Sequence, residues 1–330
     1  MKTIAGAQFP PKIVSGPTRC VADIAPDKTG VTNHAPTNAN IKFSKWLSFY
    51  TKLLVVVTFF LVIAGGLVTS TKSGLAVPDW PLSYGKLMPP MVGGIRFEHT
   101  HRMIASLVGL MTLVLTIWIG FTENRKWLRW MGIAAFGMVV SQGILGGLTV
   151  LYLLPAPISV THACLAQTFF AFMVCLAYVT SREWSEEFSP PGLDFSSVKK
   201  LLLLTVALIY TQLILGAAFR HTGNRLILIP HVVSAFLVLI DILLVLTTIM
   251  KNMASQKKLM YPAILLGALA VLQMGLGMGA FIFVVSLASA HVEPSAGHVF
   301  FVTSHQTLGA LLLAAAVFLT LRVSRMEKFK

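Results

Sequence analysis

Long apolar segments alternate with short polar ones along most of the chain. A membrane-spanning helix needs about 20 mostly apolar residues, and a succession of segments meets this requirement. They are Leu53–Thr71, Met103–Thr122, Trp130–Ser181, Leu201–Phe219, Leu226–Met250, Leu259–Val292 and Pro294–Leu321. The longest of them is interrupted by Pro155 and Pro157 and predicts two helices joined in a tight hairpin. The pattern therefore predicts an all-α integral membrane protein with eight transmembrane helices.

The composition agrees with this fold class and excludes others. Charged residues make up 12% of the chain, against about 25% in soluble domains, and the mean hydropathy is +0.77. These values exclude a nucleic-acid-binding protein, a disulfide-rich secreted domain and a disordered chain. Of the 26 basic residues, those predicted to lie opposite the termini are Lys72, Lys86, Arg96, Arg102, Arg220 and Arg225. Because basic residues collect on the cytoplasmic side of membrane proteins, both termini are predicted to be cytoplasmic.

A short motif recurs in alternate spans. Glutamine precedes glycine by four residues three times, in Gln142–Gly146, Gln212–Gly216 and Gln273–Gly277. The first span keeps only the small residues Ala64-Gly65-Gly66. We interpret the recurrence as a duplication that produced two four-helix bundles, helices 1–4 and helices 5–8. The alternative is that small residues recur wherever membrane helices pack closely.

The predicted organisation follows from these spans. It comprises a flexible polar tail (1–45), an N-terminal four-helix half (46–181), a cytoplasmic linker (182–199), a C-terminal four-helix half (200–322) and a cytoplasmic tail (323–330).

Four histidines occupy equivalent places in this organisation. Each lies in the first turns of every second span, near the predicted outer face: His101, His162, His231 and His305. Ionisable groups inside a bilayer are costly and are usually functional, although a single membrane histidine often only forms hydrogen bonds. Two imidazoles that face each other across a four-helix bundle can hold a haem. Zinc is disfavoured, because no closely spaced histidine, cysteine and carboxylate residues supply a tetrahedral set.

The two halves differ at one position. Glu98 precedes His101 by three residues and shares its helix face, whereas Leu228 stands at the aligned position of the second half. A carboxyl group beside a haem ligand can relay protons or stabilise a developing positive charge. The alternative is that Glu98 pairs with Arg96 or Arg102 at the lipid surface.

These residues resemble a known family. The segment Gly66-Leu-Val-Thr-Ser-Thr-Lys-Ser-Gly74-Leu-Ala-Val-Pro78-Asp79-Trp80-Pro81, followed by Glu98-His-Thr-His101-Arg102, is similar to haem A synthase, and Arg220-His-Thr-Gly223 is similar to the counterpart signature in the second half of that family. The resemblance covers roughly residues 50–321. It implies oxidation of the C8 methyl group of haem O to a formyl group, which yields haem A for terminal oxidases. Two successive hydroxylations and loss of water would produce the formyl group.

The resemblance also implies roles for individual residues. His231 and His305 would be the axial iron ligands of a resident haem b that passes electrons, and His101 and His162 would bracket the substrate haem. Glu98 matches the essential acid of the family. The secondary candidates are His99 beside Glu98, and Arg102, Arg220 and Arg225, which would pair with haem propionates or with lipid headgroups. Trp80 is interpreted as part of the interfacial aromatic belt.

Partners and location are expectations of the same kind. Residues 70–100 contain no cysteine, which excludes the thiol relay of some family members and leaves the electron donor open. Haem O is the expected substrate, and haem O synthase and further copies of the chain are candidate partners. The N-terminal tail is poor in arginine and serine, which favours a bacterial inner membrane over a mitochondrial one.

Two other functions compete with this hypothesis. A di-haem cytochrome that exchanges electrons with quinol would need the four histidines, but it would need neither Glu98 nor the Pro78–Pro81 loop. A transporter is suggested by the repeat and by Asp241, the one acid within an apolar span, but it would place its polar site near the midplane, whereas nearly all polar groups here are predicted at the outer face. The transporter is therefore the weakest of the three hypotheses.

Overall fold

The computed structural model describes residues 43–186, 192–286 and 294–328, which are all-helical apart from loops and turns. The helices are α1 (Lys45–Ser70), α2 (Ile95–Thr122), α3 (Lys126–Leu151), α4 (Ala156–Val179), α5 (Arg182–Ser185), α6 (Ser196–Thr222), α7 (Arg225–Asn252), α8 (Lys257–Phe281) with a π-helical turn (Ile282–Ser286), and α9 (Ala296–Lys328). Eight of these are long and apolar enough to cross a membrane. The predicted all-helical membrane fold with eight spans is confirmed. The predicted N-terminal tail lies almost entirely outside the described residues.

The helices extend beyond the apolar segments from which they were predicted. For example, α1 begins at Lys45 rather than Leu53, and α2 begins at Ile95 rather than Met103. An apolar criterion stops at the first charged residue, whereas a helix continues until its terminal backbone groups find other partners. At the start of α1, the Ser44 hydroxyl accepts a hydrogen bond from the Leu47 amide at 3.4 Å.

Two of the tight connections contain residues with positive φ angles. Between α3 and α4, Leu153 and Leu154 have positive φ angles of 59° and 60°, and α4 begins directly after Pro155. Between α6 and α7, Gly223 has a φ of 66° and ends α6, and the Asn224 side chain caps Leu226 at 3.0 Å. Glycine adopts this left-handed conformation at little cost, which explains its place in the Arg220–Gly223 motif.

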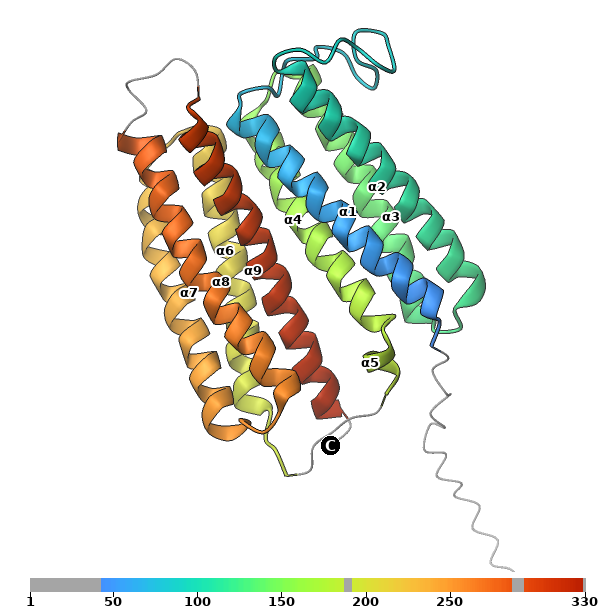
Figure 1. The fold of residues 1–330 in the computed structure, drawn as a ribbon, viewed down its shortest axis with the longest axis vertical. Coiled ribbons are helices and arrows are strands. Elements are labelled where there is room, and N and C mark those ends of the chain that lie inside the picture. Colours follow the sequence, from blue (N-terminus) through green and yellow to red (C-terminus); the bar gives the residue numbers. More distant parts are fainter. Residues whose placement is uncertain (1–42, 187–191, 287–293, 329–330) are drawn as a thin grey trace, which may run out of the picture. The chain divides into compact units, whose positions relative to one another are not determined.

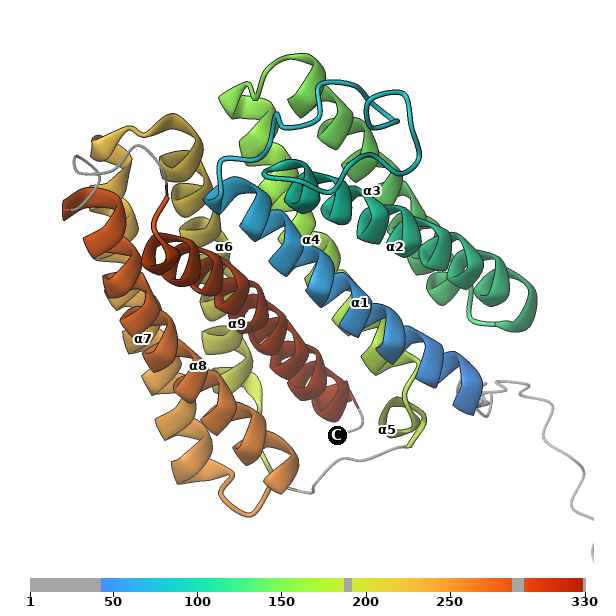
Figure 2. The same ribbon diagram turned by 45° about the horizontal axis from the view of Figure 1, so that its top comes forward.

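The long helices pack as two groups of four (Figures 1 and 2). In the first group α1 contacts α2 and α4, and α3 contacts α2 and α4. In the second group α6 contacts α7 and α9, and α8 contacts α7 and α9. The groups meet where α1 and α4 contact α9 and where α4 contacts α6. The two groups consist of the same helices as the two predicted halves. The common origin of the halves and the side of the membrane on which the termini lie stay predictions.

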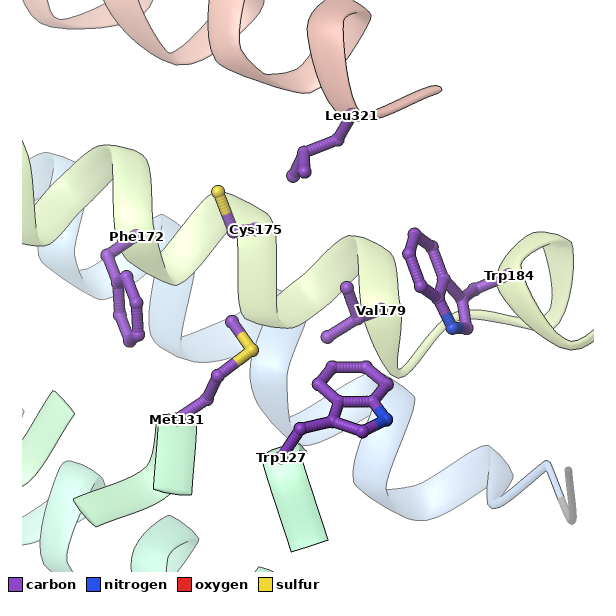
Figure 3. Close-up of a pocket in the computed structure, with 7 residues that line it drawn as sticks. All are labelled: Trp127, Met131, Phe172, Cys175, Val179, Trp184 and Leu321. Atoms are coloured by element: carbon purple, nitrogen blue, oxygen red, sulfur yellow. The ribbon is translucent and has the colours of Figure 1, made fainter. Parts of the chain in front are cut away.

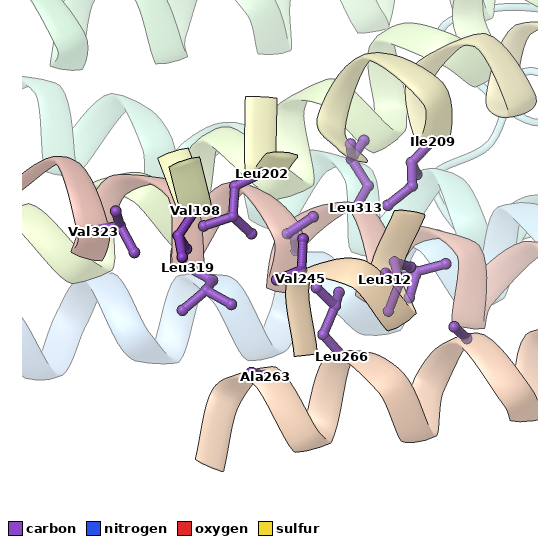
Figure 4. Packing of buried hydrophobic residues seen from close by; sticks show 14 of the residues in the cluster. Val198, Leu202, Ile209, Val245, Ala263, Leu266, Leu312, Leu313, Leu319 and Val323 are labelled. Carbon is purple, nitrogen blue, oxygen red and sulfur yellow. The ribbon is translucent and has the colours of Figure 1, made fainter. Parts of the chain in front are cut away.

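Two apolar clusters lie between the helices, and the larger one also reaches the first group through Val62 of α1 and Phe170 of α4. Figure 4 shows the larger one, which fills the space between α6, α7, α8 and α9 with residues such as Leu202, Val245, Leu266 and Leu319. Large apolar side chains also cover the outside of the helices, among them Phe60, Leu110, Phe121, Leu226 and Phe236. Helices that are apolar on all sides are typical of a protein surrounded by lipid.

A cavity of about 420 Å³ lies at the end of the helices opposite to the four histidines. Figure 3 shows its aromatic and apolar lining, formed by Trp127, Met131, Phe172, Cys175, Val179, Trp184 and Leu321. The cavity carries no group suited to acid–base chemistry at membrane depth, and we do not assign it to the functional site.

Candidate functional site

The four predicted histidines lie in equivalent surroundings. Each imidazole rests against a glycine of the preceding long helix. A Cβ atom built on Gly65, Gly146, Gly216 or Gly277 would lie 3.1, 3.5, 2.9 and 2.9 Å from Cε1 of His101, His162, His231 and His305, respectively. At Gly216 and Gly277 a Cβ atom would displace the ring, at Gly65 it would be a tight fit, and at Gly146 it would make an ordinary contact.

The recurring glutamines form hydrogen bonds with the backbone of three of these histidines. Their side-chain Nε2 atoms donate hydrogen bonds to the backbone carbonyl of the histidine on the next long helix. The bonds are Gln142 to His162 at 3.0 Å, Gln212 to His231 at 2.7 Å, and Gln273 to His305 at 3.0 Å. Leu61 stands four residues before Gly65, where the other three helices have glutamine. The motif of glutamine four residues before glycine therefore joins two neighbouring helices by a hydrogen bond at the level of His162, His231 and His305, but not at His101.

His231 and His305 form a pair. Their rings come from α7 and α9, with centroids 6.3 Å apart and planes inclined by 84°. Nδ1 of His305 lies 3.3 Å from the carbonyl oxygen of Gln273. A hydrogen bond at Nδ1 leaves Nε2 as the nitrogen that can bind a metal. This pair could hold one metal ion between its two rings.

The structure does not favour a metal site of another kind. Within the described residues, no three histidine, cysteine or acidic side chains come together as a zinc site would require. Cys164 and Cys175 are free thiols on α4. A centre with two protein ligands, such as a bis-histidine haem, is the arrangement that these side chains can support.

Glu98 is buried in the first turn of α2, with 3% of its surface exposed. Its Oε1 atom forms an ion pair with the Arg102 guanidinium at 2.6 Å, and its Oε2 atom accepts the amide hydrogen of Val77 at 2.9 Å. The pairing with Arg102 was one alternative from the sequence, but it occurs beneath a loop and not at an exposed surface. Glu98 therefore joins the start of α2 to the loop that precedes it.

Arg102 joins the same two elements more extensively. Its guanidinium donates to the backbone carbonyls of Asp79 at 2.7 Å, Leu82 at 2.8 Å and Val77 at 3.1 Å. Together with Glu98 it fixes the loop formed by residues 71–94, which we call the outer loop. The outer loop lies over the ends of α1 and α2 at the top of Figure 1.

A compact turn gives the outer loop its shape. The Asp79 carboxylate accepts the amide hydrogens of Gly85 at 2.8 Å and Tyr84 at 2.7 Å. These backbone hydrogen bonds lower the pKa of Asp79, so the carboxylate stays charged to a lower pH than usual. The turn therefore loses its acceptor only when the pH falls through this lowered pKa.

His99 also serves the outer loop. Its side chain is 5% exposed, and its Nδ1 atom lies 2.9 Å from the Ser83 hydroxyl. This contact directs His99 toward the loop, in line with its position on another face of α2 than His101. As a secondary candidate, His99 is placed to hold the loop.

Trp80 lies closer to the histidine site than sequence reasoning indicated. A Cβ atom on Gly147 would lie 2.9 Å from both Cδ2 and Cε2 of Trp80, so the indole packs directly on α3. Gly147 adjoins Gly146, against which His162 rests. The position of Trp80 between Asp79 and Pro81 in the motif was the sequence signal for a role of this residue. The motif does not specify which helix the indole contacts.

The two arginine candidates of the second half occupy different places. Arg220, at the end of α6, donates from Nη2 to the Ser70 hydroxyl of α1 at 2.9 Å. Thr303 of α9 donates to the same hydroxyl at 2.8 Å, two residues from His305. Arg225 is exposed at the first position of α7. Arg220 therefore connects the two groups of helices near the histidines, whereas Arg225 is a surface residue.

Asp241 lies away from the histidines. It is buried on α7 and accepts a hydrogen bond from the Thr205 hydroxyl of α6. This contact gives the acid a role in packing α6 against α7, and it lends no support to a transport pathway.

Comparisons with known proteins found sequences that are similar to this chain. A family model described as cytochrome oxidase assembly protein (COX15-CtaA) matches residues 95–231, which include Glu98, His101, His162 and His231. The chain is 29% identical over 191 residues to a haem A synthase of Exiguobacterium sibiricum (56% of this chain, 61% of the relative) and 28% identical over 190 residues to one of Geobacillus kaustophilus (55% and 57%). A haem A synthase of Bacillus pumilus is 25% identical over 261 residues (69% and 84%). The chain thus spans about three fifths of the length of the first two relatives.

Proposed function

We propose that this chain, which belongs to the haem A synthase family, oxidises the C8 methyl group of haem O to the formyl group of haem A. The relatives to which it is similar carry the name haem A synthase. The observation that carries the proposal is the buried Glu98, three residues from His101 and beneath the outer loop. At the aligned position, the second half has Leu228.

The resident cofactor in this proposal is a haem b between His231 and His305. Two metal–imidazole bonds of about 2.0–2.1 Å, with roughly 1 Å from each nitrogen to its ring centre, span about 6 Å. The observed 6.3 Å between the two ring centroids agrees with this span. When bound, such a haem supplies one-electron transfer, and the protein contributes the two ligands, which are fixed by Gln212 and Gln273.

The substrate site in this proposal lies in the first half. His101 and His162 lie on α2 and α4, and each is next to a glycine of the preceding long helix. They would bracket haem O, with Trp80 packed on α3 at Gly147, the residue after Gly146. The outer loop above them would exclude water from the reacting methyl group.

Glu98 has two tasks in the proposed mechanism. Its carboxylate accepts hydrogen bonds from Arg102 and Val77 and so keeps the outer loop in place. Beside the substrate it would take up or release a proton during hydroxylation, or stabilise positive charge that develops on the substrate. Arg102 supports this carboxylate and the loop, and His99 contacts the loop at Ser83.

The first test is the Glu98→Ala variant, assayed in membranes supplied with haem O. Positioned acid–base groups contribute roughly 100- to 10,000-fold to a rate, so we expect conversion to haem A to fall by at least about 100-fold while haem b stays bound. The measurement is extraction of the pigments with mass analysis, together with the reduced optical spectrum. Glu98→Gln is the matched variant, because it keeps an acceptor for Val77 and removes the acid.

Normal haem A formation by Glu98→Ala would remove Glu98 from the mechanism. For the unmodified protein, haem b together with hydroxylated haem O or haem A is the expected pigment content. Haem b alone, even when haem O is supplied, would replace this proposal with the di-haem electron carrier.

We further propose that the protein lies in a bacterial plasma membrane with the histidine site near the outer face. The distribution of basic residues and the bacterial relatives support this placement. Labelling of a cysteine introduced at the exposed Leu87 of the outer loop by a membrane-impermeant reagent tests it in intact cells. Labelling only after the cells are opened would reverse the orientation.

A further inference from the structure

We propose that His101 is the exchangeable ligand of the substrate haem and that His162 is the fixed one. This inference rests on the proposed function and names the iron face at which oxygen would react. It follows from a comparison of the four histidine positions with one another.

The four positions share one geometry and differ in one anchor. At His162, His231 and His305, a glutamine of the preceding long helix donates to the histidine backbone carbonyl. At His101 the corresponding residue is Leu61, whose side chain has no hydrogen-bond donor. A Cβ atom added to Gly65 would nevertheless lie 3.1 Å from Cε1 of His101, within the range of 2.9–3.5 Å found at the other three glycines. The four rings therefore lie in similar positions. What His101 lacks is the glutamine that donates a hydrogen bond to the backbone carbonyl of the histidine.

The start of α2 is held by the outer loop in place of a glutamine. Glu98 and Arg102 flank His101, and their hydrogen bonds run to the backbone of Val77, Asp79 and Leu82. A loop that lies over helix ends has fewer packing constraints than a neighbouring transmembrane helix. The side chains that flank His101 are thus bonded to a loop, whereas the backbone carbonyl of His162 is bonded to Gln142 of α3.

This difference has a chemical consequence. An iron with two imidazole ligands has no open position, and reactions with oxygen need one. Release of His101 would open the iron face that lies on the side of α2, where Glu98 shares a helix face with His101. The opened face and the candidate acid would then lie together, and His162 would keep the substrate in place from the opposite side.

The test restores the missing anchor. Leu61→Gln places a donor where the other three helices have one, and Leu61→Met is the control of similar volume without a donor. The probe is carbon monoxide binding to the reduced protein that contains both haems, followed optically. One hydrogen bond of ordinary net strength corresponds to about fivefold in an equilibrium constant, so we expect carbon monoxide affinity to fall about fivefold in Leu61→Gln and to stay unchanged in Leu61→Met.

A reciprocal variant makes the test independent of how well Leu61→Gln assembles. Gln142→Met removes the anchor of His162, and we expect it to raise carbon monoxide affinity because a second ligand becomes exchangeable. Equal carbon monoxide affinities in the unmodified protein, Leu61→Gln and Gln142→Met would overturn the proposal. A loss of carbon monoxide affinity in Leu61→Met as large as that in Leu61→Gln would also overturn it.

The readout also separates this inference from the proposed function. If haem O is bound but never converted, the proposed function fails, while the order of carbon monoxide affinities still tests which histidine exchanges. If haem A forms normally and the affinities do not differ, the ligand assignment fails and the function stands.

Discussion

At the scale of single residues, glycine determines how closely each histidine approaches its neighbouring helix. The tightest contacts belong to Gly216 and Gly277, where an added Cβ would lie 2.9 Å from the rings of His231 and His305. Side-chain carbons do not approach so closely without displacement. These two glycines therefore help to set the 6.3 Å separation of the histidine pair.

Gly277→Ala should displace His305 and weaken haem b binding. Changes next to a metal ligand typically cost about 10- to 100-fold in affinity, and we expect a loss in this range. Haem content of the purified protein, titrated with added haem, measures the effect. Gly275→Ala on the same helix is the control, because an added Cβ there meets nothing within 4 Å. Equal haem affinity in both variants would contradict the role of Gly277.

At the scale of elements, the outer loop and the start of α2 behave as one unit. Arg102 supplies hydrogen bonds to three loop carbonyls and the ion pair with Glu98, and both side chains are largely buried. Removal of one partner of a buried ion pair leaves the other without compensation. The loop should therefore detach when Arg102 is replaced, even though the Asp79 carboxylate keeps its hydrogen bonds from Tyr84 and Gly85.

Arg102→Gln should make the outer loop accessible to protease. Breaking a buried pair costs about 3–5 kcal/mol, which is enough to open a surface loop. Limited digestion with trypsin, with cleavage after Lys86 as the readout, measures the opening. Arg96→Gln is the matched control, since Arg96 is exposed near the start of the same helix and its guanidinium lies over the ring of Phe97. Cleavage at the same rate in both variants would show that Arg102 does not hold the loop.

At the scale of the described helices, the two groups of four are joined at the histidine end through α1, α6 and α9. Ser70 is 1% exposed and accepts hydrogen bonds from both Arg220 and Thr303. Gly66 brings α1 close to α9 at the same level, with an added Cβ only 3.1 Å from Thr303. In the proposed function, this contact keeps the electron-supplying and substrate sites at a constant separation.

Ser70→Ala should destabilise the junction between the two groups. It leaves the buried Arg220 and Thr303 donors without their acceptor, and a lost partner of this kind costs about 1–3 kcal/mol. Thermal unfolding in detergent measures the change. Ser106→Ala is the control, because the Ser106 hydroxyl is exposed and bonds only to the carbonyl of its own helix at Arg102. An unchanged melting temperature in Ser70→Ala would place the junction elsewhere.

Much of this protein was predictable from sequence because membrane helices are specified locally. Each span must satisfy its backbone hydrogen bonds within itself and must be apolar over its length, so the eight helices and the depth of His101, His162, His231 and His305 were visible in the pattern. The recurrence of glutamine before glycine was visible as well. Its structural meaning was not, because a motif within one helix does not identify the atom that it contacts on another.

The tertiary structure alone decided the partners of these residues. It showed that the glutamines hold histidine carbonyls, that Arg102 pairs with Glu98 beneath the outer loop, and that Trp80 packs on Gly147. Apolar periodicity determines whether a segment spans the membrane, but contacts between distant residues depend on how the helices are arranged. The sequence by itself therefore determined the class of protein and its candidate residues, and the packing of the helices determined which of them act together.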